Sequence, residues 1–114
     1  MGGAGFVGSH FADALTQAGH DVTIFDIRPS RYIQPKQKFI QGDSLDSAAV
    51  QKAIQGHDVV YNFAGLADIY ESLSKPVETV RLNVLACVQQ LEACRQAGVK
   101  RYVFASSVYC FGVL

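Results

Sequence analysis

The chain opens with the residues M-G-G-A-G-F-V-G, in which Gly2, Gly5 and Gly8 recur at every third position. Glycines at this spacing let a backbone turn tightly, approach a pyrophosphate closely and pack the following helix against a sheet. Bound phosphates would lie at the amino end of that helix, where free N–H groups and the helix dipole favour an anion. Ordinary glycine-rich turns also match this pattern, so its meaning depends on the residues that follow.

Asp26 is the second candidate, because it ends an apolar run about 20 residues beyond the glycines. An acidic residue at this distance accepts hydrogen bonds from the adenosine ribose hydroxyls, and its charge disfavours a 2′-phosphate. Asp26 therefore favours NAD over NADP, although the nearby Arg28 could accept a 2′-phosphate. The alternative is a strand-end aspartate that caps a turn.

Three further groups follow apolar runs. Asp43 lies in a Gly-Asp-Ser turn, where it could bond an adenine edge or act only as a turn aspartate. The segment N-F-A-G at 62–65 has small residues that let the backbone approach a flat cofactor. Ser106 and Ser107 follow the last apolar run, either as functional hydroxyls or as two serines that start a turn.

Alternating helical and β-rich runs must position these residues. Helical spacing predicts three helices, from about Gly8 to Ala18, from Asp46 or Ser47 to Gly56, and from Pro76 to Ala97. The strands expected from the β-rich runs are Asp21–Asp26, Lys38–Gln41, Asp58–Ala64 and Lys100–Ala105. The segment 66–75 is expected to be a loop with at most one helical turn. This order predicts an α/β fold with a doubly wound parallel sheet covered on both faces.

Apolar residues at helical spacing also predict which helix faces are buried. In the first helix these residues are Phe11, Ala14, Leu15 and Ala18. In the second they are Ala49, Val50, Ala53 and Ile54. In the long helix they are Val77, Val80, Val84, Leu85, Val88 and Leu91.

The sequence begins inside the glycine turn, although a turn of this kind joins a strand to a helix. In the doubly wound order that strand is central, between the strand ending at Asp26 and the strand starting near Asp58. Without it, backbone groups on both neighbours are unpaired and apolar side chains are exposed. We therefore expect an N-terminally shortened chain or fragment that lacks about five to seven apolar residues and binds NAD weakly on its own.

Composition narrows the function classes. The 114 residues suffice for one domain, over 1–114 and partial if its first strand is missing, and 10 basic residues balance 10 acidic ones. That balance argues against a nucleic-acid or membrane surface, and no signal peptide or membrane span is visible. Cys87, Cys94 and Cys110 have no zinc-type spacing and are expected to be reduced thiols in a cytoplasmic protein. His20 and His57 precede strands and are expected to be solvated turn residues.

Together the motifs resemble the N-terminal part of the extended short-chain dehydrogenase/reductase family, in its branch of NAD-dependent epimerase/dehydratases acting on nucleotide sugars. The matching segments, in the family's order, are G-G-A-G-F-V-G-S-H at 2–10, F-D at 25–26, G-D-S at 42–44, N-F-A-G at 62–65, Asn83, and F-A-S-S-V-Y-C-F-G at 104–112. The resemblance implies a Rossmann-like fold and NAD as the cofactor. The cofactor residues it implies are Gly2, Gly5, Phe6, Val7 and Gly8 at the pyrophosphate, Asp26 at the ribose, Asp43 and Ser44 at the adenine, Phe63, Ala64 and Gly65 along the cofactor, Asn83 bracing that strand region, and Ser106 beside the nicotinamide.

Ser107 matches the family's catalytic Ser/Thr, whose hydroxyl would hydrogen-bond the substrate hydroxyl or ketone. The family's proton-transferring Tyr-x-x-x-Lys pair is not matched: Tyr109 has Val113 at the lysine position. The literal match at 32–36 lies on the adenosine side and is rejected. We therefore expect an enzymatic parent and an inactive isolated chain.

The resemblance implies that the parent transiently oxidises a sugar carbon of a nucleotide sugar by hydride transfer to NAD. Two alternatives remain. One is a hydroxysteroid or dihydroflavonol-type dehydrogenase, which acts on another small hydroxyl or carbonyl substrate, and the other is a non-catalytic dinucleotide-binding sensor or scaffold. Because the family dimerises through two helices, of which Pro76–Ala97 matches one, a homodimer of the intact protein is also implied.

Overall fold

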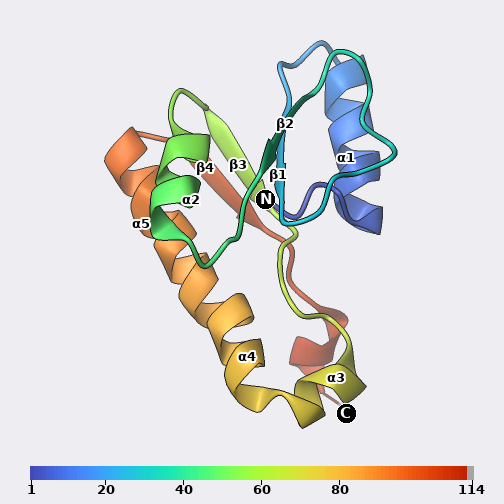
Figure 1. The fold of residues 1–114 in the computed structure, drawn as a ribbon, viewed down its shortest axis with the longest axis vertical. Helices are drawn as coiled ribbons and strands as arrows, with labels where there is room; N and C mark the ends of the chain where they lie inside the picture. The colour runs from blue at the N-terminus through green and yellow to red at the C-terminus, as the bar shows by residue number, and fades with distance from the viewer. Residues whose placement is uncertain (113–114) are drawn as a thin grey trace.

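The computed structural model describes residues 1–112, so Val113 lies outside the described residues. The helices are α1 (Phe6–Gln17), α2 (Ser47–Ile54), α3 (Ile69–Ser74), α4 (Pro76–Val80) and α5 (Ala86–Ala97) (Figure 1). The strands are β1 (Thr23–Asp26), β2 (Lys38–Gln41), β3 (Val59–Asn62) and β4 (Arg101–Phe104). Helices lie between parallel strands along the chain, which confirms the predicted α/β class.

The four strands form two parallel sheets of two strands each, β1 with β2 and β3 with β4. Helix α1 lies on one side of the strands, and α2 and α5 lie on the other (Figure 1). The core lies on the α2 and α5 side and consists of Phe25, Val50, Ala53, Ile54, Val60, Ala93 and Cys94. This is the predicted doubly wound arrangement, divided between β1 and β3.

Met1 and Gly2 join the two sheets through main-chain hydrogen bonds. The α-amino group of Met1 donates to the Tyr61 carbonyl at 2.9 Å, and the Met1 carbonyl accepts from the Phe63 N–H at 3.0 Å. On the other side, the Gly2 N–H donates to the Phe25 carbonyl at 2.9 Å. These two residues therefore lie between β1 and β3 and pair with both strands, as the last two residues of a parallel strand would.

Burial of the Met1 α-amino group makes the stability of the chain depend on pH. Desolvation lowers the pKa of this amine to about 6, against the opposing effects of Asp26 and Cys94. Since the folded-state pKa lies below the unfolded one, stability is complete above the unfolded value and falls as the pH drops through the folded one. We expect the free energy of unfolding to fall by about 2 kcal/mol between pH 8 and pH 6 in urea titrations.

An N-terminally acetylated chain is the control for this pH dependence. Acetylation keeps the N–H donor to Tyr61 but removes the titrating amine, so the loss of stability between pH 8 and pH 6 should shrink by about 2 kcal/mol. All other ionisable groups are common to both chains. An equal slope in both chains would contradict the assignment to Met1.

Several element boundaries differ from those expected. α1 begins at Phe6 rather than near Gly8, because the turn reaches helical geometry immediately after Gly5. The segment after β3 contains the helix α3, which Asp68 starts by accepting a hydrogen bond from the Glu71 N–H. The long helix spans Pro76–Ala97 as predicted, but its turn Arg81–Leu85 is π-helical.

The predicted buried stripe of the long helix is wrong. Val77 is 74% exposed and Leu91 is 45% exposed, and the other members of the stripe lie between these values. The helix instead faces the core with the residues Ala86, Gln90, Ala93 and Cys94. Small residues on that face allow α5 to approach α2, so the larger valines and leucines lie on the opposite, exposed face.

The predicted buried face is correct for α2 and largely wrong for α1. The inner face of α2 is as predicted, since Val50, Ala53 and Ile54 are buried. In α1 the predicted face is largely wrong: Phe11 and Ala14 are exposed, and the buried residues are Gly8, Ser9 and Ala12. The buried residues lie where α1 meets the glycine turn, whereas Phe11 stays 38% exposed although its ring packs against Tyr61 of β3 and against Phe63. Within the described residues, no helix is long and apolar enough to cross a membrane.

Candidate functional site

The glycine turn leads into α1 and lies against the residues that follow β3. Gly2 has φ +68°, and a Cβ on it would lie 2.5 Å from the Ala64 nitrogen. A Cβ on Gly8 would meet the Gly2 carbonyl oxygen and would lie 2.7 Å from the Gly3 Cα. No other residue type fits these close backbone approaches. They bring the turn and the helix into direct contact.

The amino end of α1 is open to a ligand. Gly5 is its N-cap, and no side chain caps the helix there or places an acidic group in its first turn. The first N–H groups of a helix have no partner within the helix, so here they remain available to an anion. The Phe6 side chain is 81% exposed and Val7 is 57% exposed beside them.

Asp26, the last residue of β1, holds the glycine turn in place. Its Oδ2 accepts a hydrogen bond from the Ala4 N–H at 3.0 Å, and its Oδ1 accepts from the Arg28 N–H at 3.2 Å. An ionised carboxylate has about four lone-pair sites, so Asp26 can still accept from a ligand hydroxyl. Sequence reasoning missed Ala4, because a backbone N–H leaves no mark on the residue type.

A second polar contact shapes the end of β3. The Asn62 side chain is 2% exposed, and its Oδ1 accepts from the Ala64 N–H at 2.9 Å. This bond turns the chain through Phe63 and Ala64, beside the glycine turn. Asn62 was not among the predicted site residues, although an asparagine inside an apolar strand signals a specific buried hydrogen bond.

Asn83 braces the loop that follows. Its Oδ1 accepts from the Leu66 N–H at 2.7 Å, and its Nδ2 donates to the Leu66 carbonyl at 3.0 Å. A Cβ on Gly65 would lie 2.8 Å from the Asn83 Oδ1, so Gly65 permits this approach. Asn83 lies in the π-helical turn Arg81–Leu85, a feature that is frequent at functional sites.

Substituting Asn83 by alanine is expected to lower the free energy of unfolding by about 1 to 2 kcal/mol, because it removes both bonds to Leu66. Asn83→Asp keeps the acceptor for the Leu66 N–H and should lie between wild type and Asn83→Ala. Urea unfolding measures the loss, and amide exchange at Leu66 locates it. Unchanged exchange at Leu66 in Asn83→Ala would show that the brace does not hold this loop.

The remaining predicted residues lie at the ends of β2 and β4. Asp43 and Ser44 are half-buried after β2, and the Asp43 Oδ1 accepts from the Leu45 N–H at 2.9 Å, as in a turn aspartate. Ser106 and Ser107 are exposed after β4. Because the strands are parallel, these residues lie at the carboxyl ends of their strands, as Asp26 and Phe63 do at the ends of β1 and β3.

Two titratable groups near β4 have shifted pKa values. A hydrogen bond with the Ser106 hydroxyl, 3.5 Å from the thiol, lowers the pKa of Cys110. Burial, together with Cys87, strongly raises the pKa of Tyr102, whose hydroxyl donates to the Gln90 Oε1 at 3.0 Å. Both effects favour the protonated form of Tyr102.

The groups still to be placed are possible metal ligands, Tyr32 and His57. No group of three His, Cys, Asp or Glu residues that could hold a metal occurs in residues 1–112. Tyr32 is exposed in the loop between β1 and β2. His57 is not a solvated turn residue: its Nε2 lies 3.0 Å from the Thr23 Oγ1, and its Nδ1 lies near the Ile54 and Gln55 carbonyls.

Comparison with known proteins assigns the family. The model of the NAD dependent epimerase/dehydratase family matches residues 1–114. The chain belongs to the NAD-dependent epimerase/dehydratase family. This membership confirms the resemblance drawn from the glycine, Asp26 and serine motifs.

Relatives of this epimerase/dehydratase chain include a UDP-glucose 4-epimerase from Lactobacillus helveticus, 36% identical over 118 residues, which are 99% of this chain and 36% of the relative. The structure of MoeE5 in complex with UDP-glucose and NAD has a TM-score of 0.89 and 36% identity over 99% of this chain and 37% of that chain. A Brucella ovis UDP-glucose 4-epimerase in complex with NAD has a TM-score of 0.92 and 32% identity over 98% of this chain and 36% of that chain. This chain therefore spans little more than a third of the length of these three proteins.

Proposed function

We propose that residues 1–114 form the NAD-binding portion of a nucleotide-sugar epimerase or dehydratase. The observation that carries the proposal is the contact between Asp26 and the Ala4 N–H, 3.0 Å long. This contact places a carboxylate suited to ribose hydroxyls against the turn that leads to the open amino end of α1. In a dinucleotide the ribose is likewise next to the pyrophosphate, so one molecule could meet both the carboxylate and the helix end.

The residues present fit NAD. The close approaches at Gly2 and Gly8 leave a turn without side chains, over which a pyrophosphate could reach the first N–H groups of α1. The Asp26 carboxylate favours an unphosphorylated ribose and therefore NAD over NADP. Phe63, Ala64 and Gly65 would line the cofactor, Asp43 and Ser44 would flank the adenine, and Ser106 would lie beside the nicotinamide.

The activity proposed for the whole protein is transient oxidation of a sugar carbon. When bound, NAD supplies a hydride acceptor that later returns the hydride. Ser107 would hydrogen-bond the sugar hydroxyl or ketone at the oxidised carbon. The solved relatives bound to UDP-glucose support a nucleotide-sugar substrate rather than a steroid or flavonoid.

Cellular setting and assembly follow as further parts of the proposal. Cys87, Cys94 and Cys110 are all free, which supports a cytoplasmic location. The exposed apolar face of α4 and α5, which includes Val77, Val84 and Leu91, supports a homodimer of the intact protein through this helix.

Titration of the isotope-labelled chain with NAD and with NADP, followed by NMR, tests the proposal. We expect weak, saturable binding of NAD, with the largest shifts at the amides of Ala4, Phe6 and Asp26, and clearly weaker binding of NADP. Shifts scattered over α5 and β4 without saturation, or no shifts at all, would remove the cofactor assignment.

A further inference from the structure

A buried glutamine interrupts the apolar contact between α5 and the strands β3 and β4. Gln90 lies on the core face of α5 together with Ala86, Ala93 and Cys94, and its side chain is fully buried. Its Oε1 accepts a hydrogen bond from the Tyr102 hydroxyl at 3.0 Å, but its Nε2 has no hydrogen-bond partner within residues 1–112. A buried amide donor without a partner destabilises the folded state, so packing alone does not explain a glutamine at this position.

Tyr102 connects Gln90 to the carboxyl end of β3. In the register of the two strands Tyr102 is opposite Val60, and Asn62 follows Val60 on the same face, because side chains alternate along a strand. The Asn62 side chain forms a hydrogen bond with the Tyr102 hydroxyl, which partly opposes the rise in the pKa of Tyr102 caused by burial. Since this hydroxyl donates its proton to Gln90, it accepts from the Asn62 amide nitrogen.

Asn62 extends the contact to the segment beside the glycine turn. Its Oδ1 accepts a hydrogen bond from the Ala64 N–H at 2.9 Å. The nitrogen and oxygen of an asparagine amide turn together about a broad terminal torsion, so a bond to the nitrogen also directs the oxygen. The Ala64 nitrogen lies so close to Gly2 that a Cβ there would be 2.5 Å from it. The position of Ala64 therefore affects the turn itself.

We propose that Gln90 and Tyr102 are positioning residues for the cofactor site. They hold the Asn62 amide, and its oxygen fixes Ala64 beside the glycine turn. Three hydrogen bonds in series form this connection, from the Gln90 Oε1 through the Tyr102 hydroxyl and the Asn62 amide to the Ala64 N–H. The assignment deepens the proposed function and rests on it, because that function places Ala64 along NAD.

The first test compares the double variant Gln90→Leu/Tyr102→Phe with wild type, in the 114-residue chain without NAD. The variant replaces both partners by apolar groups of similar shape and removes the unpartnered donor, so its urea midpoint should equal or exceed that of wild type. Amide exchange at Ala64 should nevertheless accelerate by about three- to tenfold, as expected when a typical hydrogen bond is weakened. Exchange at Leu66 should not change, because its bond to Asn83 does not involve Tyr102.

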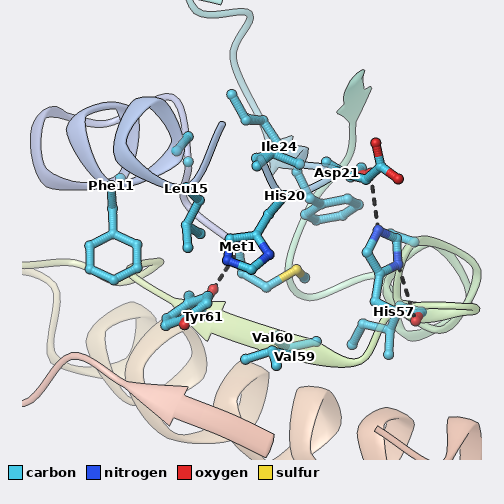
Figure 2. A pocket seen from close by; sticks show the side chains of 18 of the residues that line it. Met1, Phe11, Leu15, His20, Asp21, Ile24, His57, Val59, Val60 and Tyr61 are labelled. Atoms are coloured by element: carbon cyan, nitrogen blue, oxygen red, sulfur yellow. Dashed lines mark hydrogen bonds between the residues drawn. The ribbon is translucent and has the colours of Figure 1, made fainter. Parts of the chain in front are cut away.

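Tyr61→Phe is the matched control, because it removes a tyrosine hydroxyl from the residue before Asn62. The Tyr61 ring packs against Phe11 on the α1 side of β3, away from α5 (Figure 2). We expect this variant to leave exchange at Ala64 unchanged. Equal Ala64 exchange in wild type and the double variant would overturn the proposal. A lower urea midpoint of the double variant, with faster exchange at both Ala64 and Leu66, would also overturn it, since the pair would then stabilise the fold as a whole.

Titration of both chains with NAD separates this proposal from the cofactor assignment. We expect the double variant to bind NAD more weakly by about threefold or more, because a smaller fraction of it has Ala64 in place. If neither chain binds NAD, the cofactor assignment fails, and Ala64 exchange still decides whether the pair positions this residue. Equal NAD binding by both chains, with faster Ala64 exchange in the variant, would overturn a role for the pair in the cofactor site.

Discussion

Replacing Gly8 by alanine is expected to lower the free energy of unfolding by about 2 kcal/mol and to weaken NAD binding. The added Cβ would meet the Gly2 carbonyl oxygen and the Gly3 Cα, and backbone atoms cannot rotate away as a side chain can. α1 would therefore move off the turn that it contacts. The gain in helix propensity, about 1 kcal/mol, offsets only part of this cost. Urea unfolding and the NAD titration measure both effects.

Gly5→Ala is the matched control, because it makes the same change in the same turn. A Cβ on Gly5 would lie 3.4 Å from the Gly2 carbonyl oxygen, an ordinary contact. We expect a loss below about 1 kcal/mol, mainly because alanine is a poorer N-cap than glycine. Equal losses for Gly5→Ala and Gly8→Ala would show that the close approach of helix and turn is not what the glycines provide.

Removing the Asp26 carboxylate in Asp26→Ala is expected to raise the Kd for NAD by about tenfold or more, because hydrogen bonds to a charged acceptor contribute about 1.5 to 3 kcal/mol each. The Ala4 and Arg28 N–H groups also lose their acceptor. The preference for NAD over NADP should shrink, since the repulsion of a 2′-phosphate disappears. Titration with both cofactors measures the two changes together.

Two further variants separate the effect of the Asp26 charge from the effect of its hydrogen-bond acceptors. Asp26→Asn keeps one oxygen acceptor without the charge, so a recovery of NAD binding without a recovery of cofactor preference would assign the preference to charge. Asp21→Ala removes an exposed aspartate near the amino end of the same strand and should leave both affinities unchanged. If Asp21→Ala weakened NAD binding as much as Asp26→Ala, the loss would come from the net charge of the chain and not from the position of Asp26.

The close backbone contacts of Gly2 and Gly8 and the place of Asp26 beside the glycine turn could be predicted from residue types and spacing. These features depend on side chains: glycines permit backbone contact because they have none, and Asp26 presents a carboxylate at the end of a strand. Ala4 could not be predicted, because only its backbone N–H is used. The turn role of Asp43 was one of the alternatives left open, and spacing alone could not decide between them.

The fold was predictable in element order and less so in packing. Periodicity identified the long helix but not its buried face, because an apolar stripe does not show what covers it. Val77 and Leu91 of the predicted stripe are exposed. The π-helical turn at Asn83 was also not visible, because one extra residue in a turn leaves the sequence pattern almost unchanged. In both cases tertiary contacts decide what the local pattern leaves open.

The bridge formed by Met1 has a consequence for the order of folding. Met1 and Tyr61 are 60 residues apart, whereas each helix and turn closes over a few residues. Long-range closures are entropically costly before other contacts reward them, so the bridge should form late, after β1–β2 and β3–β4. Substitutions at Met1 should then accelerate unfolding far more than they slow refolding. Met1 would then be the last link between two pairs of strands that already share one core, in which Phe25 of β1 and Val60 of β3 both lie.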